Sequence, residues 1–152
     1  MILLLKRISL FAGFSDQELE KIREVCEGTF VKKGETIFRE GDIGEKCYMI
    51  LKGEVRISKH IPNIGEEALA VLHEGDYFGE MALIDEFPRS AYAIANTDAS
   101  LIVLKKEDLD SIFTTDRELG FKFFQAFART LSRRLREMND KMAGFLAIAS
   151  GF

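Results

Sequence analysis

The sequence is poor in the residues that bind metals, form disulfides or make nucleophile–base pairs. Its 152 residues include only two cysteines, Cys26 and Cys47, and two histidines, His60 and His73. The cysteines lack the Cys-x-x-Cys spacing of zinc and iron–sulfur sites, so we expect both to be reduced and buried. Two isolated histidines form no ligand cluster, and no Ser-His-Asp or Cys-His pairing is indicated. The sequence therefore predicts neither a metal site nor an enzyme.

Cationic charge and long apolar runs are also scarce. Lysine and arginine number 21 against 25 for aspartate and glutamate, a net charge of −4, which argues against a surface that neutralises nucleic-acid phosphates. The basic cluster Arg129–Arg136 shares its predicted helix with Glu137 and Asp140, so we interpret it as a solvated helix face. No apolar run suits a secretory signal or approaches the ~20 residues of a membrane span. We expect a cytoplasmic protein with no nucleic-acid or membrane partner.

The residues that are present fit one folded domain. Hydrophobic residues make up 47% of the chain and charged residues 30%, which is typical of a soluble domain rather than of disorder. We predict a single domain over residues 1–152, divided into an N-terminal helical segment (1–29), a β-roll (30–104) and C-terminal helices (105–152).

The N-terminal segment carries the signature of a helix start. Ser15 and Glu18 have the spacing of a capping box, and Phe14 and Leu19 can form a hydrophobic staple around it. These residues predict a helix from about Asp16 to Glu27.

The middle of the chain has the pattern of short strands. Glycines at positions 34, 41, 44, 53, 65, 75 and 79 separate short apolar runs. Val55–Ser58 alternates apolar and polar residues, and residues 60–65 are typical of a hairpin tip. About eight strands fit into residues 30–104, the spacing expected of a barrel or jelly roll. The predicted fold is therefore mainly β with flanking helices: an eight-stranded jelly-roll β-barrel between an N-terminal helix and a long C-terminal helix.

From Lys105 onward the pattern becomes helical. A first helix is expected at Glu107–Phe113, and the capping-box spacing of Thr115 and Glu118 predicts the start of a second, long one. Its apolar positions advance in steps of four and three, as in the seam of a coiled coil: Phe124, Ala128, Leu131, Leu135, Met138, Met142 and Phe145.

Two interpretations of this apolar stripe are open. All of it could pack on the roll, which suits Phe121–Phe127, where aromatic residues crowd several faces of the helix. Beyond that segment the stripe narrows and polar residues flank it, so we favour a homodimer contact in which two helices meet. The residues of this predicted contact are Leu131, Leu135, Met138 and Met142.

The stretch GEMALIDEFPRSA, residues 79–91, carries the candidate chemistry. Gly79 lets the backbone approach a ligand, and the N–H groups of Met81 and Ala82 would open a short helix whose start attracts an anion. Arg89 adds a planar, permanently charged donor for two phosphate oxygens, and Ser90 and Ala91 could supply further donors.

The negative Glu80 instead needs a donor, such as a hydroxyl group beside the phosphate. A 3′,5′-cyclic nucleotide offers both groups; the alternative is a surface ion pair between Glu80 and Arg89.

These residues resemble the phosphate-binding cassette of cyclic nucleotide-binding domains. The resemblance rests on Gly-Glu-Met-Ala-Leu-Ile followed by Pro-Arg-Ser-Ala, and it extends to 10–15, 41–42, 48–50 and 53–55. It implies an eight-stranded roll flanked by helices, with Glu80 on the ribose 2′-OH and Arg89 on the cyclic phosphate. It also implies that Ile57 and Leu69 line the pocket beside the base. Arg134 and, from the partner subunit, Asn139 match base-proximal positions of the catabolite-activator branch.

The resemblance implies a sensor that carries no cofactor other than its ligand, cAMP or cGMP, with cAMP favoured. We expect occupancy to be transmitted through the C-terminal helix to a downstream protein that the sequence does not identify. Alternatives are the effector-sensing fragment of a Crp/Fnr-like transcription regulator without its DNA-binding module, and a dimerisation module with a vestigial pocket. A metal enzyme of cupin type would need more histidines than His60 and His73.

Overall fold

The chain folds into two four-stranded antiparallel sheets with helices at both ends of the sequence. The structure is a computed structural model and describes residues 1–151, so Phe152, the end of the predicted C-terminal segment, lies outside the described residues. The predicted eight-stranded roll is confirmed. Its strands are β1 (Glu27–Val31), β2 (Thr36–Phe38), β3 (Lys46–Lys52), β4 (Val55–Ile61), β5 (Gly65–Leu72), β6 (Tyr77–Phe78), β7 (Tyr92–Ala95) and β8 (Ala99–Lys105).

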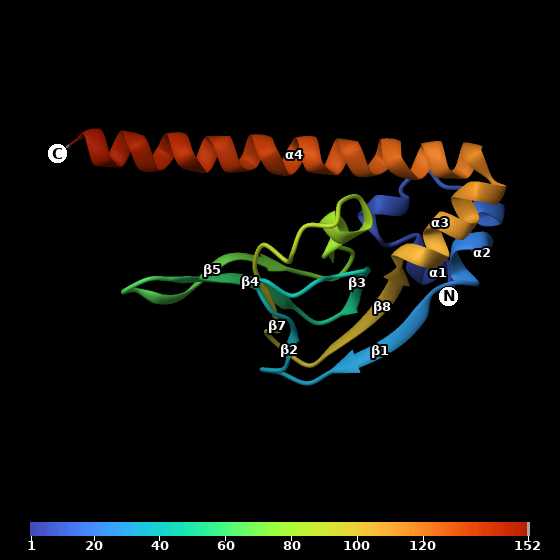
Figure 1. The fold of residues 1–152 in the computed structure, drawn as a ribbon, viewed down its shortest axis with the longest axis horizontal. Coiled ribbons are helices and arrows are strands. Elements are labelled where there is room, and N and C mark those ends of the chain that lie inside the picture. Colours follow the sequence, from blue (N-terminus) through green and yellow to red (C-terminus); the bar gives the residue numbers. More distant parts are fainter. Residues whose placement is uncertain (152) are drawn as a thin grey trace.

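The helices gather at one end of the roll, and only the last of them extends along it (Figure 1). The N-terminal elements are α1 (Ile2–Leu5), the 3₁₀ turn η1 (Ser9–Phe11) and α2 (Asp16–Arg23). A second 3₁₀ turn, η2 (Glu80–Leu83), follows β6. The C-terminal elements are α3 (Lys106–Thr115) and α4 (Arg117–Ser150).

The central strands β3 and β8 separate two apolar cores. One sheet has the strand order β1-β8-β3-β6 and the other β2-β7-β4-β5. Because side chains alternate along a strand, Ile102 and Leu104 of β8 join the core beneath the helices, whereas Leu101 joins the core inside the roll. On β3, Met49 and Ile50 divide in the same way. The central strands β3 and β8 therefore have near-continuous apolar sequence, and helices cover the outer face of their sheet.

Two predicted boundaries are wrong at the start of the roll. The first long helix ends at Arg23, and β1 already begins at Glu27, inside the segment expected to be helical. Residues 27–31 pair along their whole length with β8, and a backbone paired in a ladder cannot also form helical hydrogen bonds. At the other end, β8 extends one residue past the predicted limit, and its Lys105 forms an ion pair with Glu27 at 2.6 Å.

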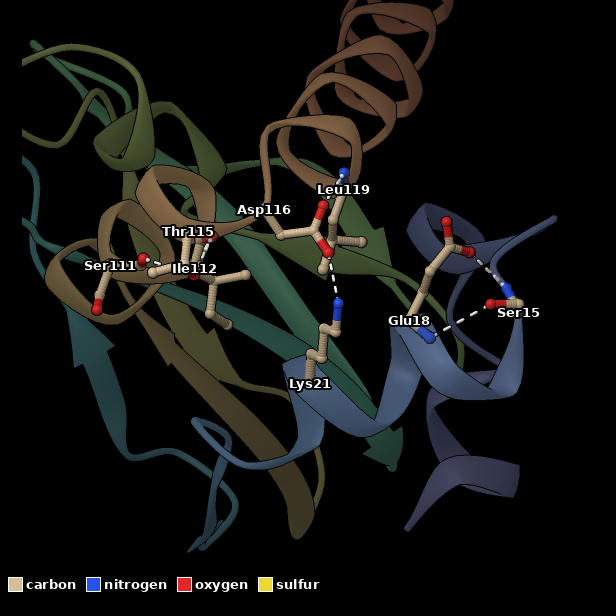
Figure 2. Close-up of polar contacts among 8 residues, drawn as sticks. All are labelled: Ser15, Glu18, Lys21, Ser111, Ile112, Thr115, Asp116 and Leu119. Carbon is tan, nitrogen blue, oxygen red and sulfur yellow. Dashed lines mark hydrogen bonds and ion pairs between the residues drawn. The ribbon is translucent and has the colours of Figure 1, made fainter.

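The helix caps are seen in Figure 2, where one prediction is confirmed and one is wrong. The Ser15 hydroxyl accepts a hydrogen bond from the Glu18 N–H (3.3 Å), and the Glu18 carboxylate accepts one from the Ser15 N–H (2.7 Å), as the capping box predicted. The N-cap of α4 is Asp116, whose carboxylate accepts from the Leu119 N–H at 3.0 Å. Thr115 is not the cap because α3 continues to this residue, and its hydroxyl donates to the Ile112 carbonyl.

The two caps are also joined to each other. Lys21 of α2 contacts the carboxylate of Asp116 at 2.5 Å (Figure 2), and Lys122 of α4 contacts that of Glu18 at 2.7 Å. Each capping carboxylate thus serves its own helix and receives a cation from the other one. The hydrogen bond from Lys21 lowers the pKa of Asp116 from its ordinary value. These contacts fix α2 against the beginning of α4.

We expect Asp116→Ala to lower the melting temperature more than the neighbouring Thr115→Ala, because only the former loses both the cap and the ion pair with Lys21. The folded-state pKa of Asp116 is depressed, so its contribution to stability is present above the ~3.9 of an unfolded aspartate and is lost as the pH falls through the folded-state value. The difference from wild type should therefore shrink in acid. Thermal unfolding followed by circular dichroism at neutral and acidic pH measures it; equal melting temperatures for the two variants at neutral pH would contradict the assignment.

The long helix α4 has one face on the roll and a second face in solvent. Leu119, Phe123 and Phe127 are buried at spacings of four residues, whereas Phe121 is 71% exposed. The expectation that Phe121–Phe127 packs on the roll is therefore correct for two of its aromatic residues and wrong for Phe121. Every residue from 135 to 151 is exposed, and in Figure 1 this half of α4 stands away from the β4–β5 hairpin. None of the helices in residues 1–151 combines the length and apolarity needed to cross a membrane.

Candidate functional site

The candidate site begins at a turn that requires glycine. Gly79 joins β6 to η2 with a φ of 73°, in the left-handed region that other residues rarely adopt. The predicted short helix is present as the single turn η2, anchored by the buried Ala82 and Leu83, while Met81 is half exposed. The turn therefore places Glu80 immediately after a backbone segment that no larger residue could form without strain.

Arg89 is buried beside this turn, with 8% of its surface exposed. Its Nη1 donates to the Gly79 carbonyl at 2.8 Å and its Nη2 to the Lys46 carbonyl at 2.7 Å. The guanidinium carbon lies 4.1 Å from the centre of the Phe38 ring. The Arg89 backbone is held as well, because its N–H donates to the Asp42 carbonyl at 2.7 Å. Main chain and side chain are thus both fixed.

The charge of Arg89 has no counter-ion in the described part of the chain. Between residues 1 and 151 no carboxylate lies within 4.0 Å of the guanidinium, and its Nε has no hydrogen-bond partner. Burial lowers the pKa of Arg89, which reflects the cost of holding a charge away from water. An arginine nevertheless remains protonated at neutral pH. A buried, uncompensated cation makes Arg89 a candidate for binding an anion.

Glu80 is equally buried but has a partner of its own. Its surface is 5% exposed, and its carboxylate forms an ion pair with Arg134 of α4. Arg134 also donates to the Tyr77 carbonyl at 2.6 Å and lies 5.0 Å from the centre of the Tyr77 ring. The alternative of a surface ion pair between Glu80 and Arg89 is therefore wrong, because both groups are buried and each has other partners. The expected solvated face of Arg129–Arg136 is likewise wrong for Arg134.

The remaining predicted residues differ in how closely they approach this centre. Ala91 is buried and Ser90 is exposed, both directly after Arg89. Ile57 on β4 is half-buried, and Leu69 on β5 is exposed at a bulge, where the register skips it between the pairs Ile57–Ala70 and Ser58–Ala68. Asn139 is exposed on α4. The structure thus brings together Gly79, Glu80, Arg89 and Arg134.

A cavity of about 500 Å³ lies next to Arg89, within the size range of small-molecule sites. Its walls come from β2, the loop after it and β3, and they include Phe38, Gly44 and Tyr48. Arg89 is the one predicted site residue that lines it. The residue pattern does not predict that Phe38, Gly44 or the Lys46 carbonyl belongs to the site. Only the Glu-Gly-Asp turn at 40–42 could have drawn attention to this loop, since its backbone pairs with that of Arg89.

The described residues hold no group of three or more histidine, cysteine, aspartate or glutamate side chains able to bind a metal. Cys47 on β3 is fully buried, as expected, and burial raises the pKa of its thiol. The prediction is wrong for Cys26, which is only partly buried because it lies between α2 and β1 instead of on a helix; desolvation still raises its pKa to about 12. Both thiols are therefore protonated at neutral pH.

Comparison with known proteins identifies the family. The profile of the family described as "Cyclic nucleotide-binding domain" matches residues 29–116. The chain is 35% identical over 133 residues to the Cyclic AMP receptor protein of Thermus thermophilus, covering 88% of this chain and 60% of that protein. It is 31% identical to cGMP-dependent protein kinase 2 of Mus musculus, covering 85% of this chain and 17% of the kinase. The CRP-like cAMP-activated global transcriptional regulator of Mycobacterium tuberculosis is 27% identical, and the chain spans 62% of its length.

Solved structures agree with this assignment. A cyclic nucleotide-binding domain from Methylobacillus flagellatus superposes with a TM-score of 0.83 at 31% identity, covering 92% of this chain and 79% of that one. The Catabolite Activator Protein of Thermus thermophilus gives a TM-score of 0.78 at 34% identity, covering 88% and 61%. The matched residues, 29–116, include the cassette of residues 79–91, in which Glu80 and Arg89 are both buried. The chain belongs to the cyclic nucleotide-binding domain family.

Proposed function

We propose that this protein is a non-enzymatic sensor of a cyclic nucleotide, bound at the cassette of residues 79–91. The observation that carries the proposal is the buried guanidinium of Arg89, which has no counter-ion between residues 1 and 151. A phosphate oxygen supplies the missing charge, and the fork of N–H groups suits two oxygens of one phosphate.

The charge balance of the site favours a cyclic phosphate. Arg89 and the partly exposed Arg134 contribute two positive charges and Glu80 one negative charge, which leaves one positive charge among these three side chains. A 3′,5′-cyclic phosphodiester carries one negative charge, whereas a phosphate monoester carries about −1.5 to −2 near neutral pH. A cyclic nucleotide therefore neutralises the centre, and a linear nucleotide brings an excess of negative charge.

Glu80 retains an acceptor for the ribose. Arg134 binds its Oε1, and within the described residues no donor reaches Oε2. A ribose 2′-OH can donate to that oxygen while the ion pair with Arg134 persists. Arg134 thus links the ligand site to α4, so that occupancy favours one placement of the helix over others and transmits the signal to a downstream protein.

The proposed ligand is cAMP in preference to cGMP. The supporting relatives are the Cyclic AMP receptor protein, at 35% identity, and the CRP-like cAMP-activated regulator. The cGMP-dependent kinase, at 31% identity, makes cGMP the alternative. Ile57 and Leu69 are proposed to lie beside the base, with Ser90 contributing its hydroxyl or N–H to the phosphate.

A second copy of the chain is proposed to complete the site through α4. If Leu135 and Met142 occupy a positions and Met138 a d position of a heptad, Arg134 is a g position and Asn139 the following e position. In a parallel two-stranded coil, g residues of one helix face e residues of the other, five positions further along. The partner subunit's Asn139 would then lie beside Arg134, and next to Glu80.

Calorimetric titration tests the function directly. We expect cAMP and cGMP to bind with a preference for cAMP, 2′-deoxy-cAMP to bind more weakly because Glu80 loses its donor, and 5′-AMP to bind weakest of the four. Bound ligand at 100 times its Kd should stabilise the fold by about 2.7 kcal/mol in a thermal shift. If folded protein gives neither a heat of binding nor a thermal shift with these nucleotides, the pocket is vestigial and the proposal is wrong.

A further inference from the structure

Gly44, in the loop between β2 and β3, occupies a position where a side chain would collide with the guanidinium of Arg89 as it lies in the structure. A Cβ atom built on this residue would lie 2.2 Å from Nε and 2.3 Å from Cζ of Arg89, far inside van der Waals contact. Gly44 does not have a positive φ, so its backbone conformation is open to any residue. The glycine is therefore required by the guanidinium next to it and not by the turn.

Substitution of the other glycines near Arg89 would not test the collision with the guanidinium alone. A Cβ at Gly79 would approach Nη1 at 2.8 Å, but also the Lys46 carbonyl at 3.1 Å, and the φ of 73° would strain any other residue. Gly41 has a φ of 88°. Only at Gly44 do all three nearest atoms belong to the guanidinium group of Arg89.

We propose that Gly44 is a positioning residue for the anion site. Because Gly44 has no side chain, there is room for the guanidinium of Arg89 to lie against the Phe38 ring and to donate to the backbone carbonyls of Gly79 and Lys46. This inference rests on the proposed function, because it assigns to Arg89 the role of binding the ligand phosphate. It adds a residue outside the cassette on which ligand affinity depends.

The contacts of the guanidinium explain why its position affects ligand binding. Two of its five N–H groups are used by the carbonyls of Gly79 and Lys46, which fix the plane of the group. Nε, the atom that a side chain at position 44 would meet first, is the nitrogen without a partner in residues 1–151. A methyl group at Gly44 therefore displaces the donors that remain for a ligand.

Displacement of the Arg89 guanidinium in Gly44→Ala should leave the fold intact. The obstructed atoms belong to the end of a long, flexible side chain, which can swing away without moving the backbone. Alanine also restricts the unfolded chain more than glycine does, which offsets part of the lost contacts. Gly44→Ala is thus expected to separate binding from stability.

The first test is calorimetric titration of cAMP into wild type, Gly44→Ala and Gly28→Ala. Gly28 is a matched control, since it has no positive φ and a Cβ there would meet nothing within 4 Å. We expect Gly44→Ala to weaken cAMP binding by at least about tenfold, and Gly28→Ala to bind as wild type, at similar melting temperatures. If wild type binds cAMP and Gly44→Ala binds equally well, the positioning role is overturned while the proposed function stands.

A second measurement needs no ligand. The Nε–H resonance of Arg89 is assigned by its absence from the spectrum of Arg89→Lys, and its hydrogen exchange is then followed in each protein. We expect slow exchange in wild type and Gly28→Ala, because Nε is buried, and fast exchange in Gly44→Ala, because the guanidinium has been displaced. An unchanged exchange rate in Gly44→Ala would refute the inference even if wild type bound no nucleotide.

Discussion

Arg89→Ala is expected to cost roughly 2 to 5 kcal/mol of cAMP binding, a weakening of about 30-fold to several thousandfold. The variant removes the one buried cation without a counter-ion in residues 1–151, so the charge of the phosphate would enter the site with no direct partner. Calorimetry measures the loss, and competition with a tighter analogue extends the range if no heat is detected.

We expect Arg89→Ala to reduce the stability of the fold less than it reduces the affinity for cAMP. Arg89 gives up two hydrogen bonds to carbonyls and its contact with Phe38, but the desolvation cost of a buried unpaired charge disappears with it. Arg136→Ala is the matched control, because Arg136 is exposed and bonds Ser132 on its own helix. Wild-type affinity in Arg89→Ala would show that the phosphate is bound elsewhere.

The parts of the site that could be predicted from sequence are those fixed by local spacing. The predicted short helix follows Gly79 as a single turn. The capping box of Ser15 and Glu18 is local in the same sense. Such features depend on residues a few positions apart, so the spacing of those residues is enough to predict them.

Contacts between distant segments could not be predicted in this way. Glu80 and Arg134 are 54 residues apart, and Arg134 was assigned to the base only through the family resemblance. Gly44 was a turn marker in the sequence, because its function depends on a side chain from another loop. The N-cap of α4 was misplaced by one residue because Thr115 had a competing acceptor in α3, whose end the pattern did not define.

The apolar stripe of α4 had two possible interpretations in the sequence, and the exposure of its residues helps to choose between them. Apolar residues occupy two faces of this helix, so periodicity alone could not separate roll contact from dimer contact. One set of apolar residues, all exposed except the partly buried Leu131, advances in alternating steps of three and four: Phe121, Phe124, Ala128, Leu131, Leu135, Met138, Met142 and Phe145. At ~1.5 Å per residue this stripe is about 36 Å long, and it starts three residues earlier than predicted, at Phe121.

Leu135→Asp is expected to convert a dimer of this protein into monomers. Leu135 is 61% exposed at the middle of the stripe, and in a two-helix contact its carboxylate variant would face its own copy across the seam, burying two like charges. Sedimentation velocity should show the mass of one chain for Leu135→Asp and of two for wild type. The control Leu3→Asp makes the same change at an exposed leucine of α1, away from α4, and should remain dimeric. If Leu135→Asp keeps the wild-type mass, α4 does not join two copies, and the partner subunit's Asn139 has no place in the site.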